Sequence, residues 1–117
     1  MDLAKIPAAL YRRVGDVIYV SGHVGFDADG NPVEDFAGHA QQTFDNLKAT
    51  LSAEDATLAD VVSTTCFLAD FANFATFNEV WAANFPTNPP SRTTVQVGFG
   101  HPGVLLEVNA IAHLNQR

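Results

Sequence analysis

The sequence predicts an α+β fold in which two amphipathic helices pack on one face of a β-sheet. Two segments repeat apolar residues every three or four positions, as helices do. The segments around them are short runs rich in valine, threonine and phenylalanine, which favours strands. The order along the chain is strand, strand, helix, strand, helix, strand, strand. With 117 residues, of which 47% are hydrophobic, the chain is expected to form a single domain over residues 1–117.

The N-terminal part predicts a strand, a turn and the first helix. Residues 17–21 (VIYVS) are β-branched and aromatic, and residues 27–32 (DADGNP) carry a turn signal, so together they indicate a hairpin or a bent strand pair. The helix begins after Asp35, whose carboxylate can accept hydrogen bonds from the free N–H groups of the first turn. Its predicted buried face consists of Phe36, Ala40, Phe44, Leu47 and Leu51.

The C-terminal part predicts the remaining three strands and a second helix. Residues 61–68 are predicted as a strand, and the second helix opens at residues 70–73. Its aromatic stripe is typical of a core-facing side and consists of Phe74, Phe77, Trp81 and Phe85. Three prolines end this helix, and strands follow over residues 92–97 and 104–113. Because two helices cover one sheet face, we expect the other face to be covered in an oligomer.

Charge and hydropathy argue against several classes of protein. Six Lys and Arg residues against 13 Asp and Glu residues give a net charge of −7, without a basic patch that could neutralise a nucleic acid. No run approaches the roughly 20 apolar residues of a membrane-spanning helix, and the N-terminus has no apolar signal core. The single cysteine, Cys66, is interpreted as a small buried residue in a cytoplasmic protein.

The four histidines do not predict a metal site. No two of them stand at ligand spacing, and no cysteine lies near any of them. We expect His39 at the surface of the first helix, His101 in a turn and His113 at the end of the last strand. The sequence contains neither a dinucleotide-binding nor a phosphate-binding glycine motif, so no cofactor is expected.

Arg92 and Glu107 are the charged residues whose positions ask for an explanation. Arg92 opens a strand directly after a rigid Pro-Pro-Ser segment, and alternation places it on the same side as Thr94 and Gln96. Glu107 lies within an otherwise apolar strand, where a bare buried carboxylate costs several kcal/mol. The local pattern favours an ion pair between Arg92 and Glu107 that closes the sheet, and a functional site is the alternative.

The segments around these residues resemble the RidA/YjgF family of enamine/imine deaminases, also called the YjgF/L-PSP endoribonuclease-like family. The matching segments are residues 20–22 (VSG), 46–49 (NLKA), 60–65 (DVVSTT), 74–80 (FATFNEV), 91–97 (SRTTVQV) and 106–112 (LEVNAIA). They follow one another in the family's order and spacing between residues 14 and 113. Several motifs over nearly the whole domain make the resemblance specific.

The resemblance implies a chorismate-mutase-like fold with a mixed sheet, assembled as a homotrimer with active sites in the clefts between subunits. It implies that Arg92 binds the substrate carboxylate with its planar guanidinium, and that Glu107 holds or activates the attacking water. It also implies that Gly22 and Thr94 line the pocket. The reaction would convert an enamine such as 2-aminoacrylate, through its imine, to a 2-oxo acid and ammonia without metal or cofactor.

Two walls of the implied pocket differ from the family's pattern. The N-terminal segment is shorter, so Tyr11 need not replace the family's pocket tyrosine, and loop 98–103 has no lysine. His23 stands where the family carries glutamine, and it is either a polar substrate-binding residue or a residue of the rim. The substrate is therefore 2-aminoacrylate or a longer unsaturated amino acid such as 2-aminomuconate.

The first hypothesis is a cytoplasmic enamine/imine deaminase that acts through Arg92 and Glu107. The alternative is a non-catalytic trimeric protein that binds small carboxylates such as 2-oxo acids, for which Arg92 alone would serve. A third function attached to the family, ribonuclease activity, conflicts with the net charge of −7. The expected partners are a small-molecule carboxylate and further copies of the chain, but neither nucleic acid nor membrane.

Overall fold

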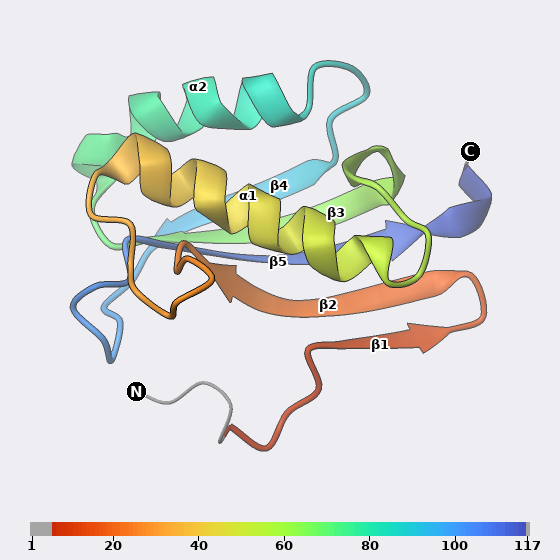
Figure 1. Cartoon of the computed structure of the whole chain (residues 1–117). Coiled ribbons are helices and arrows are strands. Elements are labelled where there is room, and N and C mark those ends of the chain that lie inside the picture. The colour runs from red at the N-terminus through yellow and green to blue at the C-terminus, as the bar shows by residue number, and fades with distance from the viewer. Residues whose placement is uncertain (1–5, 117) are drawn as a thin grey trace.

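The structure is a computed structural model and describes residues 6–116. A five-stranded sheet carries two helices on one of its faces, as the sequence predicts (Figure 1). The strands are β1 (Tyr11–Val14), β2 (Val17–Val24), β3 (Val61–Leu68), β4 (Ser91–Gln96) and β5 (Leu106–His113). The helices are α1 (Phe36–Ser52) and α2 (Phe74–Asn84). None of the helices within residues 6–116 is long and apolar enough to cross a membrane.

The strand order β1-β2-β5-β3-β4 defines two different edges of the sheet. At one edge, β4 runs parallel to β3, and α2 forms the crossover between them (Figure 1). At the other edge, β1 pairs with β2 only as far as Val20. All pairs other than β3–β4 are antiparallel, so the sheet is mixed. Beyond Val20, β2 itself therefore forms this second edge, because β1 does not extend beside it.

The N-terminal hairpin and the last strand differ from their predicted bounds. The hairpin joins β1 to β2 through Gly15, whose φ of +58° favours glycine. The turn at residues 27–32 closes only an isolated bridge between Phe26 and Pro32 and then leads into α1. β5 begins at Leu106 rather than Val104, because the preceding loop does not pair with β3 before that residue.

Aromatic rings from both helices form the centre of the core. Phe44 of α1 lies 6.4 Å from Phe77, 6.1 Å from Trp81 and 5.7 Å from Phe85, measured between ring centroids. Asp35 caps α1 as predicted, since its Oδ2 accepts a hydrogen bond from the Gly38 N–H at 2.7 Å. The prediction that the whole aromatic stripe is buried is wrong for its first member.

Phe74 is 37% exposed. It is the first residue of α2 and follows a short 3₁₀ turn at Phe71–Asn73, whereas the rings that contact Phe44 of α1 come later in the stripe. The core-facing side of α2 consists of its buried residues, Phe77 and Trp81, with Phe85 following at the C-cap.

The prediction of a surface position for His39 is wrong, because its side chain is fully buried. Its Nδ1 donates a hydrogen bond to the Val33 carbonyl at 2.9 Å, which leaves Nε2 as an acceptor. Nε2 accepts hydrogen bonds from the backbone N–H groups of Gly25 (3.2 Å) and Leu105 (3.3 Å). A Cβ at Gly25 would lie 2.5 Å from the ring, so the close approach requires glycine. His39 thus joins the loop after β2 to the residue before β5.

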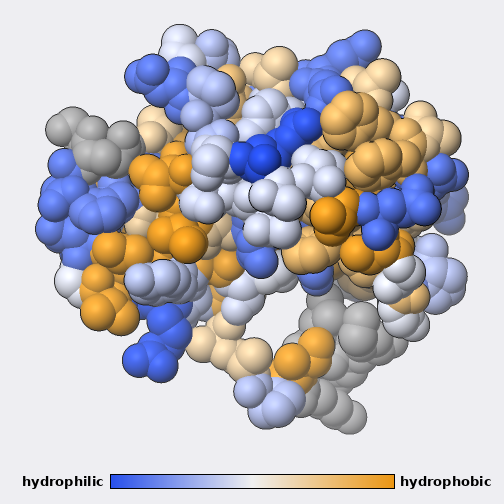
Figure 2. Space-filling model, turned by 180° about the vertical axis from the view of Figure 1, so that it is seen from behind, coloured by the Kyte–Doolittle hydropathy of each residue, from blue (hydrophilic) through white to orange (hydrophobic). Residues whose placement is uncertain are grey.

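The sheet face opposite the helices is open in the single chain. Figure 2 shows this side of the molecule, where apolar groups lie on either side of a more polar centre. Tyr19 of β2 is 49% exposed and Val95 of β4 is 37% exposed. Large exposed apolar residues on one sheet face are typical of a surface that another chain covers.

Replacing His39 by leucine should lower the free energy of unfolding by about 2–4 kcal/mol, because the N–H groups of Gly25 and Leu105 then stay buried without an acceptor. Urea denaturation at one fixed protein concentration measures the change. Lys48→Leu, on an exposed position of the same helix, is the control and should change stability by less than about 0.5 kcal/mol. A His39→Leu variant as stable as this control would contradict the role assigned to the ring.

Candidate active site

Arg92 lies at the start of the edge strand β4, on the face that the helices cover. Its Nη2 donates a hydrogen bond of 2.7 Å to the side-chain oxygen of Asn78 on α2. Its guanidinium carbon lies 5.6 Å, 5.0 Å and 5.0 Å from the ring centroids of Phe74, Phe77 and Trp81, respectively. Aromatic faces stabilise a cation by about 0.5–2 kcal/mol without neutralising its charge. The guanidinium is therefore held in place by neutral groups.

No carboxylate of residues 6–116 lies within 4.0 Å of the Arg92 guanidinium. Its neighbour Cys66 is fully buried, as predicted, and this burial raises the pKa of the Cys66 thiol to about 11, although a hydrogen bond with Thr64 and the charge of Arg92 oppose the shift. The thiol is thus neutral at physiological pH and leaves Arg92 free to bind an anion.

Thr94 follows Arg92 on the same side of β4, as predicted from alternation. Its Oγ1 is buried and has no hydrogen-bond partner within the described part of the chain. A buried hydroxyl normally finds a partner, so an unpaired hydroxyl next to a free guanidinium is a position where a ligand atom could bind.

Asn78 belongs to this site although the sequence reasoning did not identify it. It lies on α2 one position after Phe77, beside the aromatic stripe, where its amide side chain interrupts an otherwise apolar face. This polar residue on an apolar face was the sequence signal that could have identified Asn78 as a site residue. Asn78 positions Arg92, because its oxygen accepts one N–H of the fork and fixes the direction of the remaining donors.

Glu107 lies half-buried on the other face of the sheet, against the backbone of Gly22. A Cβ at Gly22 would lie 2.6 Å from the carboxyl carbon of Glu107, so glycine lets the carboxyl group rest on strand β2. Burial raises the pKa of the Glu107 carboxyl above its ordinary value. Among the residues that the structure describes, no cation forms a salt bridge with it.

The predicted ion pair between Arg92 and Glu107 is wrong, because strand register places the two side chains on opposite faces. Arg92 stands opposite Thr64 of β3, which is buried toward the helices. Glu107 stands opposite Phe67 of the same strand, three residues away from Thr64. Thr64 and Phe67 are three positions apart, and side chains an odd number of positions apart on a strand point to opposite faces. The two charges cannot pair within one chain.

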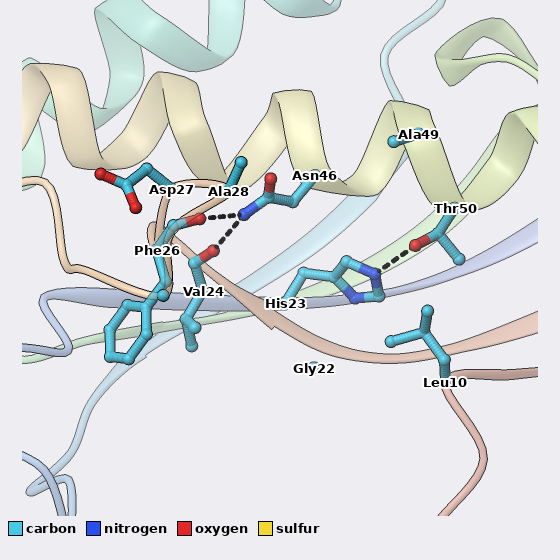
Figure 3. Close-up of a pocket in the computed structure, with 11 residues that line it drawn as sticks. Leu10, Gly22, His23, Val24, Phe26, Asp27, Ala28, Asn46, Ala49 and Thr50 are labelled. Atoms are coloured by element: carbon cyan, nitrogen blue, oxygen red, sulfur yellow. Dashed lines mark hydrogen bonds between the residues drawn. The ribbon is translucent and has the colours of Figure 1, made fainter. Parts of the chain in front are cut away.

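Gly22 and His23 lie in the C-terminal half of β2 and line a cavity of about 420 Å³ (Figure 3). His23 is buried beneath α1, where its Nδ1 donates to the Ser21 carbonyl at 2.7 Å and its Nε2 accepts from the Thr50 hydroxyl at 2.8 Å. Burial lowers the pKa of His23, and the hydrogen bond with Ser21 only partly opposes this shift. Both ring nitrogens are occupied within the chain, so its role toward a ligand stays a prediction.

Tyr11 is engaged elsewhere. Its hydroxyl donates a hydrogen bond of 3.1 Å to Glu54, which also lies 3.3 Å from Arg13. The hydrogen bond to Glu54 raises the pKa of the Tyr11 hydroxyl. Within the chain, Tyr11 joins β1 to the end of α1.

The candidate residues therefore form two half-sites. The Arg92 half-site consists of Arg92, Thr94 and Asn78 at the β4 edge, and the Glu107 half-site consists of Glu107 and Gly22 toward the β2 edge. The structure does not bring His23 together with Glu107, because the His23 side chain lies on the helix-covered face of the sheet. When two different edges of the same chain meet in neighbouring copies, the contact is heterologous and can close into a ring. Within residues 6–116, no group of three or more His, Cys, Asp or Glu residues could hold a metal ion.

Comparisons with known proteins match this chain to one family. The family model described as "Endoribonuclease L-PSP" matches residues 7–114. The mitochondrial protein MMF1 of Saccharomyces cerevisiae is 37% identical over 114 residues, which are 94% of this chain and 79% of MMF1.

Solved structures agree with the sequence match. RidA from the Antarctic bacterium Psychrobacter sp. superposes with a TM-score of 0.87 at 35% identity, covering 92% of this chain and 88% of RidA. The crystal structure of yeast Mmf1 superposes with a TM-score of 0.86 at 34% identity, covering 92% of this chain and 87% of Mmf1. The chain therefore belongs to the endoribonuclease L-PSP family, which is the RidA/YjgF family.

Proposed function

We propose that this protein is a cofactor-independent deaminase that hydrolyses enamines and imines of small carboxylates to 2-oxo acids and ammonia. One observation carries the proposal: Arg92 and Glu107 are both half-buried, and neither has an ion-pair partner among residues 6–116. A half-buried charge without a partner lowers stability, and such charges concentrate at functional sites. A carboxylate substrate would supply the missing partner of Arg92.

The working site would lie between subunits of a homotrimer. Arg92 and Glu107 face opposite sides of the sheet, so a ligand can touch both only if they come from different copies. A ring in which the β4 edge of one copy meets the β2 edge of the next would bring the two half-sites together. The apolar residues on the open sheet face support such an assembly, because another chain would cover them.

Arg92 would bind the substrate carboxylate through its planar fork. Asn78 occupies one N–H donor, and the aromatic rings hold the plane of the guanidinium. The remaining donors can form two parallel hydrogen bonds to a carboxylate, which fixes its orientation as well as its position. The unpaired hydroxyl of Thr94 would supply a further polar contact.

Glu107 would transfer the protons. The enamine becomes an imine when a proton moves from its nitrogen to its β-carbon, and water then adds to the imine carbon. Ionised Glu107 would accept a proton from the attacking water and give it to the imine nitrogen, which forms a carbinolamine. Glu107 would then pass the hydroxyl proton of the carbinolamine to the nitrogen, the C–N bond would break, and ammonia and the 2-oxo acid would form. A carboxyl group whose pKa lies above its ordinary value suits both steps, because a catalytic pKa is best placed near the working pH.

Two other functions make different predictions. A non-catalytic protein that binds 2-oxo acids would need Arg92 but not Glu107, since a second carboxylate near a bound anion weakens binding. Ribonuclease activity, which the family's description names, would need clustered cations, whereas this chain carries a net charge of −7. We therefore favour the deaminase, and we expect it to act in the cytoplasm.

Replacing Arg92 by lysine should weaken 2-oxo acid binding by about 1.5–3 kcal/mol, because lysine cannot form the two parallel hydrogen bonds of the fork. Isothermal titration with pyruvate measures the change. Arg13→Lys makes the same substitution at an exposed arginine that pairs with Glu54, and it should leave the affinity unchanged. Equal affinities of the wild type and the Arg92→Lys variant would show that Arg92 has a structural role only.

Replacing Glu107 by glutamine should lower the rate of ammonia release by about 10²–10⁴-fold, the range of a positioned acid–base group. The variant is nearly isosteric, so 2-oxo acid binding and the assembly should persist. In the wild type, the rate should rise with pH through the raised pKa of Glu107, because the ionised form acts as the base.

The rate is measured on enzymatically generated enamines after the uncatalysed hydrolysis is subtracted. Equal corrected rates for the wild type and the Glu107→Gln variant would contradict the mechanism. A wild type without any rate above the uncatalysed reaction, but with 2-oxo acid binding, would establish the non-catalytic alternative.

A further inference from the structure

Two phenylalanine rings stand exposed beside Arg92. Phe71 is 43% exposed and Phe74 is 37% exposed, whereas the other aromatic residues that follow on α2 are buried. The two rings stack on each other with centroids 5.2 Å apart and planes inclined by 28°. Exposing two large rings as one pair is unfavourable in water, so the pair is a candidate contact surface.

The pair is held in place by hydrogen bonds from both sides. The backbone N–H of Phe71 donates a hydrogen bond of 2.9 Å to the side-chain oxygen of Gln96 on β4. Asp70 caps the short turn by accepting a hydrogen bond of 2.8 Å from the Ala72 N–H. These hydrogen bonds fix the turn that carries the rings and connect the start of α2 to the end of β4.

The pair adjoins the Arg92 half-site directly. The guanidinium carbon of Arg92 lies 5.6 Å from the centroid of Phe74, and Phe71 stacks on the same ring. Along β4, the residues on this side are Arg92, Thr94 and Gln96, and Gln96 is the residue that holds Phe71. A molecule whose carboxylate binds Arg92 can therefore extend its remaining atoms along β4 toward the exposed rings.

We propose that Phe71 and Phe74 form the wall that receives the substrate's side chain, so that the site prefers apolar or aromatic side chains. The inference rests on the proposed binding of 2-oxo acids and of their enamines at Arg92. Asp70 precedes Phe71 and caps its turn with a carboxylate, which would repel a second acidic group on a ligand that reaches these rings. Dicarboxylates, including 2-aminomuconate, would therefore be poor ligands.

The test compares the affinities of pyruvate, phenylpyruvate and 2-oxoglutarate, which share the 2-oxo acid group and differ in their side chains. Isothermal titration of the wild type should show phenylpyruvate binding at least about tenfold more tightly than pyruvate, through burial of the ligand ring against the wall. 2-Oxoglutarate should bind more weakly than phenylpyruvate by a similar factor. In the Phe71→Ala variant, the ratio of phenylpyruvate to pyruvate affinity should fall about fivefold or more.

Three control measurements distinguish the effect of the Phe71 and Phe74 rings from a general effect on folding or on the Arg92 half-site. Phe71 is exposed, so Phe71→Ala should fold, and circular dichroism checks this. Glu79→Ala, at an exposed position of the same helix, should leave the affinity ratio unchanged. Phe74→Leu keeps an apolar surface but removes the stacked ring, and its ratio should lie between those of the wild type and Phe71→Ala.

The outcomes distinguish this inference from the function on which it rests. Binding of all three 2-oxo acids without preference, or an unchanged ratio in the Phe71→Ala variant, would overturn the wall and leave the deaminase proposal standing. Failure of the wild type to bind any of the three would overturn the proposed function itself, and the wall with it.

Discussion

The alternation of side chains along a β-strand places Arg92 and Glu107 on opposite faces of one sheet, and the design of the candidate site depends on this separation. Within a single chain, a pair of opposite charges would neutralise itself and leave nothing to bind a ligand. Because the register prevents that pairing, both charges stay half-buried and unpaired, Arg92 on the edge strand β4 and Glu107 on β5 beside β2. Under the proposed function, the same geometry means that a second copy of the chain would complete the site.

The guanidinium of Arg92 stays in place without a carboxylate because neutral groups surround it. Asn78 accepts a hydrogen bond from it, and the faces of Phe77 and Trp81 lie 5.0 Å away. A carboxylate in these positions would hold the arginine equally well but would compete with the substrate. Under the proposed function, part of the hydrophobic core would thus also serve ligand binding, since Phe77 and Trp81 also pack against Phe44 of α1.

Sequence periodicity predicted four of the five strands, both helices and the shared side of Arg92 and Thr94, because these follow from local spacing, whereas it did not locate β1. It could not relate Arg92 to Glu107, since the faces of two strands are linked only by the register of β3 between them. The buried position of His39 was not predicted either, because its three backbone partners lie in irregular segments, Gly25 and Val33 in the loop before α1 and Leu105 in the loop before β5. The role of Asn78 could not be predicted either, because its hydrogen bond with Arg92 forms only where α2 packs over β4.

The central claim is that each site takes Arg92 from one copy and Glu107 from another. Co-expression of Arg92→Ala chains with Glu107→Gln chains tests it, because random assembly at equal amounts places both intact residues in about a quarter of the sites of a ring. The account predicts that the mixed protein recovers about a quarter of the wild-type ammonia release, whereas each variant alone is inactive. If both residues acted from the same chain, no mixed site would be intact, and a mixture as inactive as its parents would contradict the account.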